Sequence, residues 1–297
     1  MKFLRSLKYE FKSMIAQPEF LVVVFFGVAV GILAHIPPMG FEAGGYKEYV
    51  CSPEMGSLLY QNAYGRLLYQ FLCPIMASIP AACSYFKEKK RSADALIVPA
   101  VGRRNYICAK TLMTFLSGFI VSTLPFLLNL FYSELIYPRN EMITAVTANF
   151  YVGNAQFAGE WNVFGHLMFT HPVLNHLLHI SLVGLWSAGA ALLSLGISFF
   201  SRRHYLINLL YGTAILLLAA IVLKAAAPAC CPYEAFPLLP ERLTNYVQHL
   251  YFHDPNAEIY HDFADPSGAG LAVVYVLLYG ACAALTAIHV KKYRDVI

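Results

Sequence analysis

The class of fold is indicated by the residues directly after Pro18, which read Glu19-Phe20-Leu21-Val22-Val23-Val24-Phe25-Phe26. These residues open an apolar stretch over residues 19–36, and a helix needs about 20 mostly apolar residues to cross a lipid bilayer. Residues 216–223 repeat this character as Leu-Leu-Leu-Ala-Ala-Ile-Val-Leu. Such stretches are typical of membrane-spanning helices, so the sequence predicts an all-α integral membrane protein.

The composition of the whole chain agrees with this prediction. Of its 297 residues, 58% are hydrophobic and 13% are charged, whereas soluble domains carry about 25% charged residues. So few charges cannot cover a surface that faces water. The basic residues are divided among short segments instead of gathering on one face, which argues against nucleic-acid binding.

Six segments, of which the stretch after Pro18 is the first, qualify as transmembrane helices of a single domain over residues 19–290. They cover approximately residues 19–36, 65–86, 106–132, 177–200, 205–227 and 269–290. The second contains Pro74 and Pro80 and is expected to be kinked, because neighbouring helices re-satisfy the freed carbonyl groups. The fourth carries Gly184, Gly189 and Gly196, which predict a face of small residues for close helix packing.

Charge indicates on which side of the membrane each connecting segment lies. Residues 1–18, 87–110, 201–204 and 291–297 fall on one side and hold 16 of the 21 basic residues. The other side holds 12 of the 17 acidic residues. Cytoplasmic loops are enriched in Lys and Arg, so both termini are predicted to be cytoplasmic, in a multi-pass protein of the plasma membrane.

Residues 1–18 are predicted to be an amphipathic helix that lies in the cytoplasmic membrane interface. Apolar side chains recur there at helical spacing, namely Leu4, Leu7, Phe11, Met14 and Ile15, with Arg5, Lys8 and Lys12 between them. This pattern favours contact with membrane lipids, with the lysines towards anionic headgroups. The alternative is a frayed basic tail that only fixes the topology.

The longer connecting segments are the cytoplasmic loop 87–105 and the extracytoplasmic loops 133–176 and 228–268. Long loops usually have a function or a fold of their own. In the cytoplasmic loop, residues 92–98 are expected to form two helical turns that end at Pro99. Ala95, Leu96 and Val98 would then face the cytosol, which is costly unless this helix docks into a partner.

The extracytoplasmic side holds two further candidate sites. Histidines gather outside or near the outer face, as His166, His171, His176, His179, His249, His253 and His261. His249 and His253 lie four residues apart, as two metal ligands on one helical face would; the alternative is hydrogen-bonded or solvated loop histidines. A disulfide between Cys51 and either Cys230 or Cys231 is a second hypothesis, because all three cysteines are predicted to lie outside the cell.

Residues 88–110 combine an acid, an apolar pair, a proline and basic residues in a fixed order. These are Glu88, Ala95-Leu96, Pro99, Arg103 or Arg104, and Lys110. The order resembles that of the ABC-2-type transporter permease family between its second and third spans. The family's Gly-Thr turn is replaced here by Lys90 and Arg91. The amphipathic lead-in helix, the six spans and the basic tail at 289–294 extend the resemblance in architecture to the whole chain.

The resemblance implies a permease subunit of an ATP-driven ABC exporter, which forms the translocation path and docks a separate cytosolic ATPase subunit. The docking residues would be Glu88, Asp94, Ala95, Leu96 and Pro99, supported by the helix that bears Leu4, Leu7 and Phe11. Such permeases pair as homodimers or heterodimers. ATP and Mg²⁺ bind the partner ATPase, so this chain is expected to hold no cofactor and to be no enzyme.

The sequence also lacks the Gly-x-x-x-x-Gly-Lys-[Ser/Thr] phosphate loop that an ATPase would need. Two alternatives stay open at this point. One is a membrane-embedded enzyme whose site is built from extracytoplasmic His and Asp residues. The other is a membrane sensor or scaffold subunit that transports nothing.

Overall fold

The computed structural model describes residues 2–33, 72–80, 84–85, 88–89, 94–136, 167, 171–200, 211–215, 218 and 269–292. Within them the elements are α-helices: α1 (Lys2–Ile15), α2 (Pro18–Leu33), α6 (Asp94–Val101), α7 (Arg103–Ile136), α11 (Pro172–Phe200) and α14 (Ala269–Lys292). Residues 72–80 are helical as well. The predicted all-α class is therefore confirmed for the described part of the chain.

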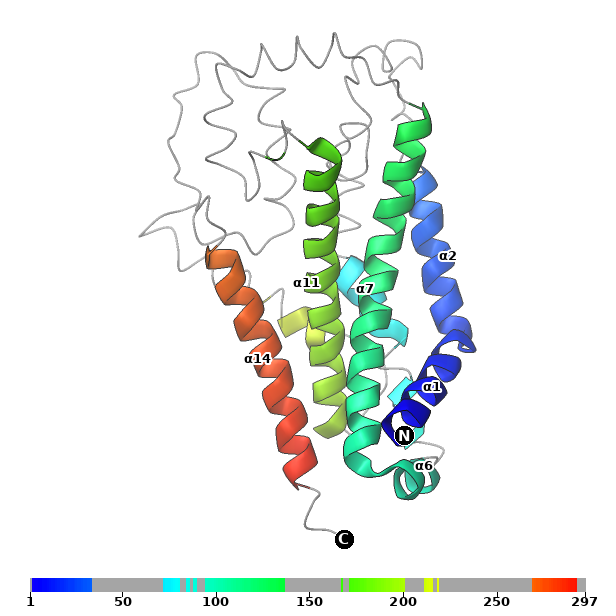
Figure 1. The fold of residues 1–297 in the computed structure, drawn as a ribbon, viewed down its shortest axis with the longest axis vertical. Helices are drawn as coiled ribbons and strands as arrows, with labels where there is room; N and C mark the ends of the chain where they lie inside the picture. Colours follow the sequence, from blue (N-terminus) through cyan, green and yellow to red (C-terminus); the bar gives the residue numbers. More distant parts are fainter. Residues whose placement is uncertain are drawn as a thin grey trace.

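Helix α7 is the central element, since it contacts α11, α2, α1, α6 and α14. Figure 1 shows α2 and α7 running in one direction along the molecule, and α11 and α14 running in the opposite direction. The same view places α1, α6, the start of α7 and the end of α14 at one end of the helix bundle. Segments that are far apart in the sequence therefore lie at the same end of the bundle.

Two of the described helices, α7 and α11, are long and apolar enough to cross a membrane. Helices α1 and α2 meet at a bend of 61° and make a third candidate if they are counted as one broken span. A shorter apolar helix covers Tyr275–Lys291 within α14. Two to three spans are thus supported by the described residues, and the count of six stays a prediction.

The contact between α7 and α11 is close because small residues lie in it. A Cβ atom added at Gly118 would lie 3.2 Å from the Cα of Ala188, and one added at Gly184 would lie 2.9 Å from Cε2 of Phe119 and would also overlap Cγ2 of Thr123. Backbones that approach this closely gain packing energy that larger side chains would prevent. The predicted close packing of the fourth span is confirmed on this side.

The other small residues of α11 face α14 instead. An added Cβ at Gly189 would overlap the side chain of Leu278, and α14 is also held by hydrogen bonds to α11 carbonyl groups. The hydroxyl of Tyr275 donates to the Leu182 carbonyl at 2.6 Å, and that of Tyr279 donates to the Leu185 carbonyl at 2.8 Å. The small residues therefore serve two helix contacts and not one face.

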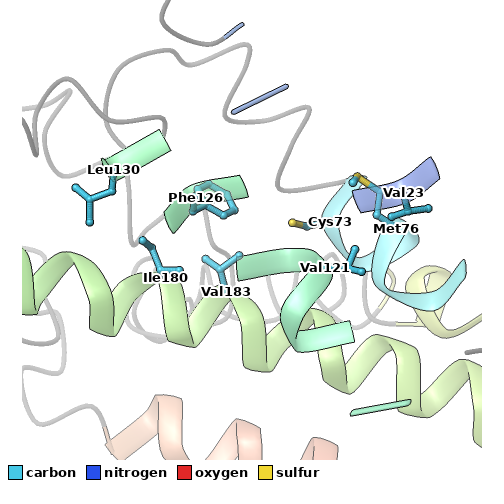
Figure 2. Close-up of a cluster of buried hydrophobic side chains, with 8 residues drawn as sticks. All are labelled: Val23, Cys73, Met76, Val121, Phe126, Leu130, Ile180 and Val183. Carbon is cyan, nitrogen blue, oxygen red and sulfur yellow. The ribbon is translucent and has the colours of Figure 1, made fainter. Parts of the chain in front are cut away.

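A hydrophobic cluster joins α2, the helical segment 72–80, α7 and α11 (Figure 2). Its buried members are Val23, Cys73, Met76, Val121, Phe126, Leu130, Ile180 and Val183. Beside this cluster, Asn129 Nδ2 donates a 2.7 Å hydrogen bond to the Gly31 carbonyl, and so links α7 to the far end of α2. The cluster and this bond keep α2 alongside α7 over its length.

The loop helix differs from the prediction at its end. It spans Asp94–Val101 and continues through Pro99, which therefore does not end it. The helix ends at Gly102, whose φ of 84° is left-handed and whose N–H donates to the Val98 carbonyl at 2.8 Å. Glycine adopts this conformation at little cost, and the reversal lets α7 begin at Arg103.

Helix α1 presents three different surfaces. Ser6, Glu10 and Met14 are buried against the bundle, whereas the apolar Leu4 and Phe11 are 65% and 49% exposed. Arg5, Lys8 and Lys12 form a third, exposed surface. The amphipathic helix predicted for residues 1–18 is present, but the side that it turns to the protein carries a polar hydroxyl and a carboxylate.

Candidate functional site

The most unusual feature of the described residues is a buried cluster of charges around Lys110. Lys110 lies two turns into α7 and is 2% exposed. A helix of this length is about 51 Å long and exceeds the roughly 30 Å hydrocarbon core of a bilayer, so its first turns reach the interface. Burial of an ammonium group is costly unless it is paired and hydrogen-bonded, so the groups around Lys110 must supply opposite charge and hydrogen-bond acceptors.

Three oxygen atoms surround the Lys110 ammonium group. Its Nζ donates to Glu10 Oε2 at 2.8 Å and to Ser84 Oγ at 2.6 Å, and lies 2.7 Å from Glu88 Oε2. An ammonium group has three N–H donors, so each donor has one acceptor. The acceptors come from α1 and from residues 84–89. Lys110 therefore joins three parts of the chain through one charged atom.

Glu88 is fully satisfied by these neighbours. Its Oε2 accepts a 2.5 Å hydrogen bond from the hydroxyl of Tyr106 in addition to the Lys110 contact. Its Oε1 accepts a longer bond, 3.4 Å, from Ser84 Oγ. Both carboxylate oxygens of Glu88 therefore have hydrogen-bond donors, and its Oε2 contacts Lys110 directly.

Glu10 is satisfied on one side only. Its Oε2 accepts from Lys110, but among the described residues no donor reaches its buried Oε1. Burial raises the pKa of Glu10 above its ordinary value; the positive charge of Lys110 opposes this effect, and the negative charge of Glu88 adds to it. The two glutamates and one lysine carry a formal net charge of −1 when all are ionised.

A small cavity opens directly beside these groups. Its volume is about 20 Å³, and it is lined by Glu10, Met14, Pro80, Ser84, Lys110, Met113, Thr114 and Ser117. A cavity needs about 10–15 Å³ by this measure to hold one water molecule. The hydroxyls of Thr114 and Ser117 give the cavity polar walls on the side of α7, so it suits a single small polar occupant.

The docking residues predicted from the sequence fall into two environments. Glu88 is buried in the charge cluster, whereas Leu96 on α6 is 80% exposed, and Pro99 is exposed beside it. Asp94 and Ala95 belong to α6, but their side chains are not described. On α1, Leu4 and Phe11 are exposed, and Leu7 is half-buried. The docking role of all these residues stays a prediction.

Other predicted sites lie outside the described residues. These are His249, His253, Cys51, Cys230 and Cys231. Among the side chains that are described, no group of three or more His, Cys, Asp or Glu residues is arranged to hold a metal ion. His176 and His179 are not solvated loop histidines, because both are buried on α11.

Glu10, Ser84 and Tyr106 are not among the site residues predicted from the sequence. The sequence pattern identifies Lys110 only as its last position, although a lysine within an apolar helix usually pairs with a group of opposite charge. The spacing of Ser6, Glu10 and Met14, each four residues from the next, was the available signal for a protein-facing side of α1. Nothing in the sequence pairs that side with Lys110.

Comparison with protein-family models, with curated proteins and with solved structures finds no match to this chain.

Proposed function

We propose that this chain is the permease subunit of an ATP-driven ABC exporter, which forms a translocation path and docks a separate cytosolic ATPase subunit. The proposal rests on one observation above all, the exposure of Leu96 on the short helix α6. Burying a leucine side chain is worth about 1.5–3 kcal/mol. A helix that presents this residue outside the apolar bundle gains stability when a partner covers it.

The charge cluster supports the same reading. Glu88 and Lys110 are the first and last positions of the pattern that resembles ABC-2-type permeases, and they lie 2.7 Å apart. Helix α6 lies between these two residues in the sequence, so their ion pair joins the chain before α6 to the chain after it. Lys110 also holds α1 through Glu10. A force applied to α6 by an ATPase would reach α1 and α7 through the direct contacts of α6 with both helices, and Lys110 ties these two helices together.

The proposal includes six transmembrane helices with both termini in the cytoplasm of a plasma-membrane protein. Support comes from the charge asymmetry of the sequence and from the helix directions in Figure 1. The first and third of six spans must run outward, and the fourth and sixth must run inward. Helices α2, α7, α11 and α14 have these relative directions.

The partners in this proposal are an ATPase subunit that binds ATP and Mg²⁺, a second permease subunit, and membrane lipids. The outward apolar and basic surfaces of α1 support lipid contact at the interface. The alternative of an extracytoplasmic His/Asp enzyme site depends on residues outside the described ranges. No observation among the described residues favours this enzyme site, and none favours a sensor or scaffold role.

Co-purification from the native membrane tests the proposal. The wild-type chain is expected to bring along an ATPase subunit that contains a phosphate-binding loop, identified by mass spectrometry. A Leu96→Asp variant is expected to lose this subunit, because the new carboxylate would have to be desolvated in the docking cleft. A stable complex of the wild-type chain that contains no ATPase would contradict the proposal.

Matched variants separate loss of docking from loss of folding. Leu96→Met keeps the size and apolar character of the side chain and is expected to retain the ATPase. Both variants should elute like the wild type in size-exclusion chromatography of the solubilised chain. If Leu96→Asp also retained the ATPase, α6 would not be the docking helix.

A further inference from the structure

We propose that Glu10 is a proton-binding site, in which a proton held on Oε1 neutralises the buried Glu10–Lys110–Glu88 cluster and strengthens the attachment of α1 to α7. This site is independent of the exporter proposal, because it depends only on contacts within the chain. The groups involved come from α1, from the segment 84–89 and from α7.

The hydrogen bonds identify which carboxyl holds the proton. Glu88 accepts at both oxygens, from Lys110, Tyr106 and Ser84, and a protonated acid there would lose part of this pattern. Among the described residues Glu10 accepts at Oε2 alone, so its Oε1 is the buried oxygen on which a proton displaces no existing bond. The proton would turn Oε1 from an acceptor into a donor.

The cavity provides a partner for that donor. Glu10 lines it together with the hydroxyl-bearing Thr114 and Ser117, and its volume of about 20 Å³ accommodates one water molecule. The protonated Oε1 can donate a hydrogen bond to a hydroxyl oxygen or to such a water. A metal cation is a poorer occupant, because the Lys110 ammonium group lines the same cavity and would repel it.

The charge balance determines the direction of the effect. The charged groups that act on Glu10 are Lys110 from α7 and Glu88. Two further titratable neighbours are the phenols of Tyr9 on α1, whose pKa is raised by burial, and of Tyr106 on α7. Helices α2 and α6, which also pack against α1, contribute no charged group that acts on Glu10 among the described side chains. Two anions facing one cation leave one uncompensated negative charge in a buried site. One bound proton removes it, so α1 is held more tightly in the protonated state.

Infrared titration of the full chain in lipid nanodiscs tests the site. The wild type is expected to show the band of a protonated buried carboxyl above the pH at which an exposed glutamate ionises. That band should disappear as the pH rises further, and it should be absent at every pH from Glu10→Gln. Absence of the band from the wild type would overturn the proposal.

Two further variants locate the proton. Glu88→Gln removes the neighbouring negative charge, so the band should persist but disappear at a lower pH than in the wild type. If Glu88→Gln abolished the band and Glu10→Gln kept it, the proton would be on Glu88 and the assignment would be wrong. Glu134→Gln, at the opposite end of α7, is the control and should leave the titration unchanged; loss of the band there would also refute Glu10 as its source.

Glu10→Gln is itself a neutral mimic of the protonated state and is therefore expected to fold. Amide hydrogen exchange of residues 2–15 gives a second readout on the same proteins. The wild type and Glu10→Gln should exchange equally at low pH, and the wild type should exchange several-fold faster at high pH. Equal exchange at every pH would show that the proton does not control the attachment of α1.

Discussion

The ammonium nitrogen of Lys110 lies 2.8 Å from a carboxylate oxygen of Glu10, although 100 positions separate the two residues in the sequence. This contact fixes the interfacial helix α1 to the start of α7, directly beside α6. Because both side chains are buried, the pair is protected from the solvent screening that weakens surface ion pairs. The end of the bundle that bears α1 and α6 is therefore one connected unit.

Removal of Lys110 is expected to be strongly destabilising. Lys110→Met should lower the free energy of unfolding by about 3–5 kcal/mol, because Glu10 and Glu88 would remain buried without a counter-charge. Thermal unfolding of the purified chain would measure the loss. Lys12→Met, which removes an exposed lysine of α1, is the control and should change stability little. Losses of similar size in both variants would contradict a special role for Lys110.

The Tyr106 hydroxyl is expected to contribute to stability through Glu88. Tyr106→Phe removes the 2.5 Å donor to Oε2 of Glu88, and hydrogen bonds to charged groups are worth about 1.5–3 kcal/mol. The exposed Tyr211 provides a matched Tyr→Phe control that should be close to neutral. Thermal unfolding of both variants in the same detergent makes the comparison, and an unchanged midpoint for Tyr106→Phe would argue against the bond.

Close approach of α7 and α11 predicts opposite outcomes for two glycines. Gly184→Ala should destabilise the chain by about 1–3 kcal/mol, because the new methyl would overlap Thr123 and lie 2.9 Å from Phe119. Gly280→Ala on α14 should be neutral or stabilising by up to about 1 kcal/mol, since nothing lies within 4 Å of its added Cβ. Thermal midpoints that rank the two variants in the reverse order would refute the packing described here.

Stability should fall with rising pH because of Glu10. Its pKa is raised in the folded chain, mainly by burial, so the folded chain binds this proton more tightly than the unfolded chain. The stabilisation is therefore complete below the ordinary glutamate pKa of 4.5 and is lost as the pH rises towards the raised value. Across this pH range the thermal midpoint of the wild type should fall relative to that of Glu10→Gln. A difference between the two midpoints that stays constant with pH would contradict the titration of Glu10.

Several features of this molecule could be predicted from local sequence alone. Apolar runs of sufficient length predict α7 and α11 because a helix is the form in which a continuous apolar segment satisfies its own backbone in a membrane. The spacing of Leu4 and Phe11 predicts α1, and the small residues of the fourth span predict its close packing. Each prediction depends on residues within a few turns of one another.

The end of α6 could not be predicted in this way. Pro99 lies in the second turn of α6 and removes only one backbone donor, and the helix continues to Val101, whereas Gly102 supplies the left-handed conformation that ends it. The sequence contains both signals, and the structure shows that the glycine prevails. The contacts of α1 could not be predicted either. Helical periodicity places Glu10 on one side of α1 but does not indicate which residues that side contacts.

Apolar length and helical periodicity are local properties, so the sequence alone predicts a helical protein that is rich in membrane-compatible segments. The tertiary structure alone shows that Lys110 pairs with Glu10 and Glu88 and that Tyr106 and Ser84 complete these surroundings. These partners come from separate segments, and burial of a charge can be compensated only by groups that the folded chain brings within hydrogen-bonding distance. That distance is a property of the packing of α1, Ser84 and Glu88 against α7, which no stretch of sequence contains.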